Sequence, residues 1–470
     1  MTAHPTWRCW APLAVALAVH LVMAYNAVYH HPYVGYDARQ HLKNLEIYSH
    51  LKLPTSAQSR EFFSPPLPYL VPALAKHFGL LATRGMRKLA QLLNLLYSVL
   101  TFVLLARLSR RRWPDDPVTM AWAFGFLGFL PVWVKSFALI RGEPLLALVT
   151  VAAAGQALLP AEDRGPTARR GLLLGIAFAA MALSRQWGLL AIAGILAALG
   201  AQMVRRRDAV RRLSAAMAIS VVVLAVGAGW FYIHLRTVEG SATAFNRSGE
   251  PSFSLANQPV HFYLGLGLPE LFTDPVRRSF ANELLPIFYS EMWGDYECYF
   301  LVYAKDLDTG RYVPGGALER ALARPESAAR LDTNRFTINR YLGRAQLLAL
   351  LPTAVLLLGF GLGLRRTWSW LAESRDGRPL SLEVVAVAVI VASFAGYLWF
   401  LIMYPSPGKG DTIKATYMLQ TMPFLALLGA AWMRRLRLRP GRLAGWLSIA
   451  LVLVYLHNAG LLFTRYTRFM

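Results

Sequence analysis

The residues that could carry chemistry begin to gather in residues 33–69, the first long polar stretch of an otherwise apolar chain. Asp37 follows Gly35 and lies soon after the first apolar run, where the chain would leave a membrane. A carboxylate at such a boundary is partly desolvated, which raises its pKa and makes it a usable general base. Asp is also a favoured helix N-cap, and 38–50 has the length of a short helix, so both interpretations of Asp37 stay open.

Two neighbours of Asp37 are candidate substrate contacts. His41 lies one helical turn after Asp37, so the two side chains can share a face. His41 could orient the base, contact a phosphate or help to hold a metal, although a single surface histidine more often does none of these. Tyr36 places an aromatic ring beside the carboxylate. The stretch ends in the sequence SPPLPY at 64–69, which cannot continue a helix and predicts an interfacial helix over 67–80.

Charged residues also interrupt two long apolar runs. Arg141 and Glu143 lie in the middle of the run 118–160, and Arg185 lies in the middle of the run 171–203. An acidic residue at the mouth of a membrane span is costly unless it is used or paired, so Glu143 either contacts substrate or forms an ion pair with Arg141. The two arginines are candidate contacts for a phosphate, or interfacial anchors.

The last candidates lie in the second half of the chain. Lys414 follows a Gly-rich segment at the start of a late apolar run. A cation beside the free N–H groups of a helix N-terminus makes a good anion site, with snorkelling to the interface as the alternative. Trp293 and Asp295 belong to 289–296, where aromatic and acidic residues alternate around a glycine. That pattern suits a sugar pocket, and it equally suits a packed surface loop.

The elements that position these residues must be membrane helices. The chain has 470 residues, of which 56% are hydrophobic and 16% charged, and its mean hydropathy is positive. These values are wrong for a soluble domain and right for a multi-span membrane protein. The net charge of +23 does not indicate nucleic acid, because the arginine clusters fall between apolar runs and not on one basic face. Two cysteines are too few for a disulfide framework.

Eleven apolar runs predict helices that cross a bilayer, for which about 20 apolar residues are needed. Polar apices split two of the longest stretches into helical hairpins. With eleven spans and an internal N-terminus, the short arginine-rich loops all face the cytoplasm, as the positive-inside rule requires. The runs are 10–28, 89–106, 118–136, 143–160, 171–184, 187–203, 213–235, 346–364, 381–403, 415–433 and 444–463.

This topology divides the chain into three parts. Residues 1–235 form an N-terminal transmembrane module whose first external loop, 29–88, carries Asp37. Residues 236–345 form an external, periplasmic loop domain of mixed structure, and 346–470 form a C-terminal transmembrane module. We therefore expect an all-α polytopic protein of a bacterial inner membrane, with a cytoplasmic N-terminus and an external site.

Taken together, these motifs resemble the GT-C superfamily of integral-membrane glycosyltransferases, and most of all the bacterial family 39 enzymes that are protein mannosyltransferase-like and aminoarabinose-transferase-like. The resemblance covers most of residues 1–200 and 400–430. The spacing of Asp37 and His41 is also similar to the first loop of the dolichol-pathway terminal glucosyltransferase. The segments that carry the resemblance are Asp37, Ser64–Tyr69, Arg141–Pro144, Ser184–Gly188 and Lys414–Tyr417 with Pro423.

The resemblance implies a bundle of GT-C type that transfers a sugar, with inversion, from a polyprenyl-phosphate carrier to a hydroxyl of a lipid, glycan or protein acceptor. Asp37 would be the catalytic base. Many members have a second acidic residue beside this Asp, and here the position is Ala38. This departure from the family pattern favours a metal-free mechanism, indicates no cofactor and leaves dependence on a divalent metal open. The donor phosphate would be held by Lys414, Arg185 and Arg141, and the substrates by Tyr36, His41, Glu143, Trp293 and Asp295.

Two other classes of membrane protein compete with this interpretation. A lipid-linked sugar flippase or another transporter would place ionisable residues near the bilayer midplane and show paired halves or broken helices. Here the charges cluster at the ends of the apolar runs. A non-catalytic scaffold gives no reason for four ionic residues to face outward, namely Asp37, Glu143, Arg185 and Lys414.

Overall fold

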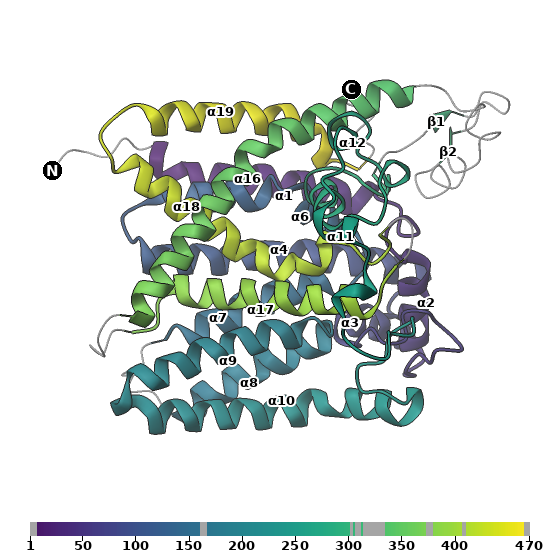
Figure 1. Ribbon diagram of the computed structural model, residues 1–470. Coiled ribbons are helices and arrows are strands. Elements are labelled where there is room, and N and C mark those ends of the chain that lie inside the picture. Colours follow the sequence, from purple (N-terminus) through teal and green to yellow (C-terminus); the bar gives the residue numbers. More distant parts are fainter. Residues whose placement is uncertain are drawn as a thin grey trace.

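The computed structural model is a bundle of long helices that lie side by side, with many of the shorter elements gathered at one end (Figure 1). We call this end the loop end. It carries α2 (Ala38–Ser49), α3 (Leu67–His77), α11 (Val260–Leu264) and α12 (Glu270–Thr273). The structure describes residues 7–159, 167–300, 304–305, 312–313, 334–372, 379–406 and 410–464.

The remaining elements follow the chain in order. The long helices are α1 (Trp7–Tyr29), α4 (Thr83–Arg112), α8 (Thr167–Ser184), α9 (Gly188–Arg205), α10 (Val210–Glu239), α16 (Asn334–Ala372) and α17 (Leu382–Met403). The shorter helices are α5 (Pro117–Gly128), α6 (Pro131–Ala138), α7 (Glu143–Ala157), α13 (Leu284–Trp293), α18 (Met422–Arg437) and α19 (Leu443–Asn458). A 3-10 helix, η4 (Ala415–Thr421), precedes α18, and β1 (Ala304–Lys305) pairs antiparallel with β2 (Tyr312–Val313).

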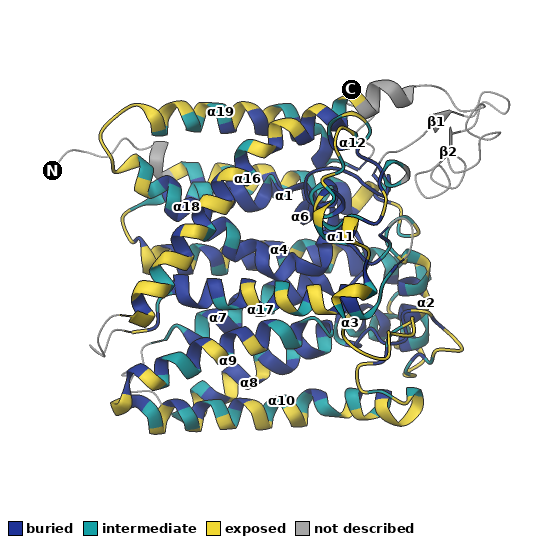
Figure 2. Ribbon diagram, viewed as in Figure 1, coloured by how far each residue is buried: buried dark blue, intermediate teal, exposed yellow. Residues whose placement is uncertain are grey.

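The outer helices present apolar side chains to their surroundings. On α10, the side chains of Val222, Val226 and Ile233 are each more than half exposed, and exposed positions follow the outer sides of α10 and α19 (Figure 2). In water such a surface would be a liability for aggregation, whereas in a bilayer it meets the acyl chains. The protein is an integral membrane protein with an all-helical bundle, as the sequence predicts.

The predicted helices are confirmed, but not all of them are full spans. Among the described residues, eight helices are long and apolar enough to cross a membrane, and a ninth is counted if α5 and α6 form one bent span. All eleven apolar runs coincide with helices. However, α7 has 15 residues and α18 has 16, fewer than the about 20 that a bilayer needs. The run at 415–433 is shortened because its first turns form the 3-10 helix η4.

The two polar apices break the chain where the sequence predicts. α6 ends at Ala138 and α7 begins at Glu143, so Arg141 lies in the turn between them. In the same way, Arg185 lies between α8 and α9. The 61° bend between α5 and α6 occurs at Pro131, which lacks an N–H group and cannot fit inside a straight helix.

The boundaries of the large loop differ from the prediction. α10 continues to Glu239, and α16 begins at Asn334, inside the segment 236–345 that was assigned to the loop. Hydropathy alone misses the last helical turn of α10 and the first turns of α16 because they contain many polar residues. The division of the chain into three domains stays a prediction.

Helices α2 and α3 pack against each other within the first loop. α3 begins directly after Pro66, whose fixed φ suits a helix start, in agreement with the interfacial helix predicted over 67–80. Leu45 and Tyr48 of α2 pack with Tyr69 and Ala73 of α3 in one buried cluster. This packing fixes the helix that directly follows Asp37.

Close packing of α9 on α17 gives a first testable prediction. A Cβ at Gly194 would lie 2.6 Å from the carbonyl oxygen of Ala388, whereas a Cβ at Gly200, on the same helix, meets nothing within 4 Å. Alanine should gain about 1 kcal/mol of helix propensity at either position. We expect Gly194→Ala to lower the melting temperature in detergent, because overpacking costs about 1–3 kcal/mol. Gly200→Ala should leave it unchanged or raise it, and equal effects of the two variants would contradict this packing.

Candidate active site

The candidate site is organised around an ion pair between Asp37 and Lys414. Lys414 Nζ donates a hydrogen bond of 2.9 Å to Asp37 Oδ2, joining the first loop to the segment before η4, 377 positions apart in the sequence. Gly35 has a φ of +134° and Asp37 a φ of +51°, so the carboxylate follows a tight turn in backbone conformations that few residues adopt. Asp37 stands at the N-cap position of α2, but its side chain makes no capping hydrogen bond.

Two expectations for Asp37 are therefore corrected. The N-cap interpretation is wrong for the side chain, which bonds Lys414 and not the helix. The expected rise in pKa is also wrong. The charge of Lys414 holds the pKa of Asp37 well below its usual range, and it outweighs the opposing effect of desolvation. In this structure Asp37 is thus an ionised and weakly basic carboxylate.

Two tyrosines flank the lysine of this pair. Lys414 Nζ lies 5.3 Å from the ring centre of Tyr36 and 5.7 Å from that of Tyr417. The guanidinium of Arg141 lies over the same two rings, at 5.3 Å and 5.9 Å. The negative faces of these rings stabilise two like charges that would otherwise repel each other. The hydroxyl of Tyr36 donates a hydrogen bond to Glu291, which fixes the ring.

Below this surface lies a buried network of charges. Arg141 donates to both oxygens of Glu143, at 2.8 Å and 2.7 Å, and Arg185 Nε donates to Glu143 Oε1 at 2.9 Å. Arg185 Nη1 also donates to Glu61 at 3.3 Å and to Ser64. The ion-pair interpretation of Glu143 is confirmed, and its side chain is fully buried. Arg141 Nη1 is buried without a hydrogen-bond partner among the described residues.

His41 belongs to the same buried layer. Its Nδ1 is 2.8 Å from the hydroxyl of Tyr69, and its Nε2 is 3.9 Å from Glu61. Burial, together with the charge of Arg185, lowers the pKa of His41 to about 3, so the ring is neutral near pH 7. His41 thus packs beneath the loop that carries Asp37, and its predicted contact with substrate stays a prediction.

A polar cavity of about 210 Å³ opens at the ion pair. Asp37, Lys414 and Tyr417 form one part of its wall, and Arg277 and Asp411, which pair with each other, form another. Arg277 also bonds Glu297 at 3.0 Å. The other lining residues are Glu61, Phe245, Asn246, Arg247, Tyr299 and Thr412. Carboxylates, guanidiniums and aromatic rings together make a surface that can bind hydroxyl groups and an anion.

Glu143, Trp293 and Asp295 do not line this cavity, although the sequence places them in a common external site. Asp295 accepts from the backbone N–H groups of Tyr299 and Phe300, at 3.2 Å and 2.9 Å. Trp293 is almost completely buried. Of the three, Asp295 supports a residue of the cavity wall, Tyr299, and the direct contact of all three side chains with substrate stays a prediction. Among the described residues, no group of three or more His, Cys, Asp or Glu is placed to hold a metal ion.

Comparison with known proteins identifies the architecture. No protein-family model and no curated protein sequence matches the chain. Among solved structures, it is similar to the Archaeoglobus fulgidus oligosaccharyltransferase tethered with an acceptor peptide, with a TM-score of 0.50 and 12% identity, over 97% of this chain and 55% of that chain. It also matches ArnT from Cupriavidus metallidurans, bound to undecaprenyl phosphate and in the apo state, with TM-scores of 0.39 and 0.38 and identities of 18% and 17%. These two matches cover 90% and 89% of this chain and 77% and 76% of ArnT.

The oligosaccharyltransferase and ArnT are both glycosyltransferases of the GT-C superfamily. The chain has a GT-C-like fold. This likeness, at 12% identity, concerns the fold alone, and it confirms the fold that the sequence motifs predict.

Several residues of the candidate site were missed at the level of sequence. Glu61 lies between Arg60 and two phenylalanines. The two apolar neighbours are the one signal in the sequence that could have indicated a buried carboxylate. Arg277 and Asp411 stand in separate loops with no shared motif, so their pairing is visible only in three dimensions. Glu291 lies within the aromatic and acidic segment 289–296, but the alternation of residues there does not distinguish it from Asp295.

The buried network gives a second prediction. Glu143→Gln removes the charge that pairs with Arg141 and Arg185, leaving two buried guanidiniums without a full counter-charge. We expect a loss of about 3–5 kcal/mol of stability, measured by unfolding in detergent. Asp208→Asn is the matched control, because Asp208 is two-thirds exposed and pairs with Arg206 at 2.7 Å. The control should leave the stability almost unchanged, because an ion pair of an exposed carboxylate is screened by water. Similar losses in both variants would show that the network does not stabilise the bundle.

The third prediction concerns pH. Burial, with the charge of Glu297 nearby, raises the pKa of Glu291 from 4.5 to about 8. Glu291 therefore contributes stability that is complete below about pH 4.5 and is lost as the pH rises towards 8. Glu291→Gln imitates the protonated form, so its melting temperature should fall less between pH 5 and pH 9 than that of the native protein. Parallel curves over this range would refute the protonated state of Glu291.

Proposed function

We propose that the protein is an inverting glycosyltransferase that moves a sugar from a polyprenyl-phosphate carrier to an acceptor hydroxyl. The observation that carries the proposal is the Asp37–Lys414 ion pair on the wall of a polar cavity, at one end of an apolar bundle with a GT-C-like fold. The bundle lies in the membrane that also holds the polyprenyl chain of the carrier. The cavity offers the sugar hydroxyl partners and its phosphate a cation.

The reaction needs a proton acceptor and a site for a phosphate anion. Asp37 accepts the proton of the acceptor hydroxyl while the hydroxyl oxygen attacks the anomeric carbon of the sugar. The bond between that carbon and the phosphate oxygen breaks, and polyprenyl phosphate leaves with the electron pair. Lys414 stabilises the charge of this leaving group, together with Arg141 Nη1, which has no hydrogen-bond partner in the described part of the chain.

Binding of the donor would activate the base. Before binding, Lys414 holds the pKa of Asp37 low. A donor phosphate competes for the same ammonium group and draws its charge away from the carboxylate. The pKa of Asp37 then rises, so the base becomes effective only when the donor is present.

The other predicted site residues differ in how close they lie to the reacting groups. Tyr36 lies beside the reacting groups and positions Lys414. Arg185 is bonded to Glu143 and Glu61, so it holds the phosphate-facing layer in place, and a direct contact with the donor requires one of these bonds to open. His41, Glu143, Trp293 and Asp295 shape the cavity from behind, and the acceptor would be a lipid, a glycan or a protein.

The arrangement of charges supports an external site in a bacterial inner membrane. Arg112, Arg366, Arg434 and Arg437 all pair with carboxylates away from the loop end, at Glu383 and Asp116. Arginine-rich loops at that end favour a cytoplasmic position for it. The polar cavity would then face the periplasm, together with the loop domain 236–345.

The fourth prediction tests the base. Asp37→Asn keeps the shape of the side chain but cannot accept a proton, so kcat should fall by about 10²–10⁴-fold. The measurement is transfer of tritiated mannose, glucose or aminoarabinose from undecaprenyl phosphate to acceptors in a membrane extract, together with release of undecaprenyl phosphate. Asp115→Asn, at an exposed position between α4 and α5, is the matched control and should retain full activity.

Two outcomes would reject the proposed function. If Asp37→Asn transfers sugar at the native rate, Asp37 is not the base. If the native protein consumes none of the donors but moves them across proteoliposome membranes, the protein is a flippase and not a transferase.

A further inference from the structure

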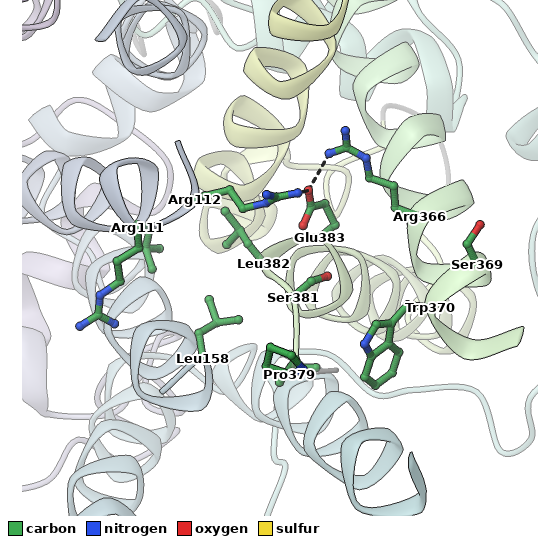
Figure 3. Close-up of a pocket in the computed structure, with 12 residues that line it drawn as sticks. Arg111, Arg112, Leu158, Arg366, Ser369, Trp370, Pro379, Ser381, Leu382 and Glu383 are labelled. Atoms are coloured by element: carbon green, nitrogen blue, oxygen red, sulfur yellow. Dashed lines mark hydrogen bonds and ion pairs between the residues drawn. The ribbon is translucent and has the colours of Figure 1, made fainter. Parts of the chain in front are cut away.

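A second cavity has a volume of about 550 Å³, and Figure 3 shows the side chains that line it. It lies at the end of the bundle away from Asp37. It is formed by the last turns of α4, α7 and α16 and by the first residues of α17. α4 has 30 residues and is about 45 Å long, so this cavity and the polar cavity lie near opposite membrane surfaces. Its volume is that of a pocket for an organic molecule and is too large for a single ion.

Glu383 presents a vacant acceptor in this cavity. Arg112 donates two hydrogen bonds and Arg366 one, all to the same oxygen, Oε1, at 2.6–3.1 Å. Figure 3 shows the carboxylate between the two guanidiniums. The other oxygen, Oε2, is buried and accepts no hydrogen bond from any described residue. Only 3% of Glu383 is exposed, so this oxygen has lost its water without gaining a donor. A ligand that donates a hydrogen bond would satisfy it.

Trp370 presents a vacant donor in the same cavity. Its Nε1 is buried and has no acceptor within the described part of the chain. The ring is fixed by Arg205, whose guanidinium lies 4.7 Å from the ring centre and which also donates to the Trp370 carbonyl. Only 7% of Trp370 is exposed. A ligand that offers an acceptor at one place and a donor at another would satisfy both side chains.

The rest of the wall fixes the character of the ligand. Three arginines, Arg111, Arg112 and Arg366, and one carboxylate line the cavity, so the site is net positive and favours an anionic group. Each guanidinium has five N–H donors, and the bonds to Glu383 leave several of them available. Leucine side chains supply the apolar part of the wall, namely Leu108, Leu158, Leu380 and Leu382.

We propose that this cavity binds the head group of a phospholipid that carries a primary ammonium, the chemistry of phosphatidylethanolamine. The ammonium donates to Glu383 Oε2, and the phosphate accepts from Arg112, Arg366 and the Trp370 indole N–H. The leucines contact the upper part of the acyl chains. The site lies at the membrane surface, where such head groups are found, and it does not depend on the glycosyltransferase function proposed above.

The fifth prediction compares two lipids that differ only in their nitrogen. Phosphatidylcholine has the same phosphate, but its nitrogen is fully methylated and cannot donate a hydrogen bond. In native mass spectrometry of the full-length protein, phosphatidylethanolamine should bind about tenfold more tightly than phosphatidylcholine. Glu383→Gln should abolish this preference, because the neutral amide no longer attracts the ammonium.

Matched variants separate this site from general effects of folding and charge. Asp116→Asn removes a carboxylate that pairs with Arg434 and Arg437 at the same end, so it should keep the preference. Trp370→Phe should weaken both lipids about fivefold, whereas Trp368→Phe, at a residue that is 73% exposed, should weaken neither. Trp370→Phe also keeps the Glu383 ion pairs intact, so it tests the site even if Glu383→Gln unfolds.

Other results would overturn the proposal. Equal binding of the two lipids by the native protein would show that only annular lipid is present. Displacement of phosphatidylethanolamine by millimolar O-phosphoethanolamine would show that the cavity takes a water-soluble phosphate. A preference that survives Glu383→Gln and is lost in Asp116→Asn would place the lipid elsewhere.

Discussion

Charged side chains inside a bundle of membrane helices are stable only when they are paired. This requirement determines the positions of most charged side chains in the candidate site. Glu143 is enclosed by Arg141 and Arg185, with no exposure to solvent. The Asp37–Lys414 pair differs because it reaches the cavity, with Asp37 38% exposed and Lys414 12% exposed. A substrate can therefore exchange partners with this pair while the deeper network stays closed.

The depth of each pair accounts for the chemistry proposed for it. The buried pairs hold Arg141 rigidly under the rings of Tyr36 and Tyr417, and these rings also steady Lys414. Lys414 thus lines the cavity, and Arg141 lies buried against the same two rings. A phosphate that pairs with Lys414 would have this second cation close by. The opposite end of the bundle also pairs its buried carboxylate, because Glu383 Oε1 bonds two arginines while Oε2 has no hydrogen-bond partner among the described residues.

The sequence predicts much of the fold because hydropathy and proline positions act locally. The polar apices at Arg141 and Arg185 and the start of α3 after Pro66 all follow from short-range rules, and all are found in the structure. The short length of α7 and the 3-10 turns of η4 cannot be predicted from these short-range rules. A helix buried inside a bundle need not cross the whole bilayer.

The electrostatics of the site are harder to predict from the sequence than the fold. Asp37 is recognisable as a candidate, but its pKa moves in the direction opposite to that expected, because Lys414 is far away in the chain and adjacent in space. Glu61 takes part in the network through its ion pair with Arg185, and the sequence around Glu61 does not point to that partner. Conversely, Trp293 and Asp295 fit a sugar-binding pattern, and the structure turns both into the interior.

The central claim is that a donor phosphate replaces Asp37 as the partner of Lys414. A cryo-EM structure of the protein with undecaprenyl phosphate bound tests this most directly. The account predicts a phosphate oxygen within hydrogen-bond distance of Lys414 Nζ and Arg141 Nη1, with the Asp37 carboxylate released towards the cavity. A phosphate bound elsewhere, with the Asp37–Lys414 hydrogen bond unchanged, would contradict it.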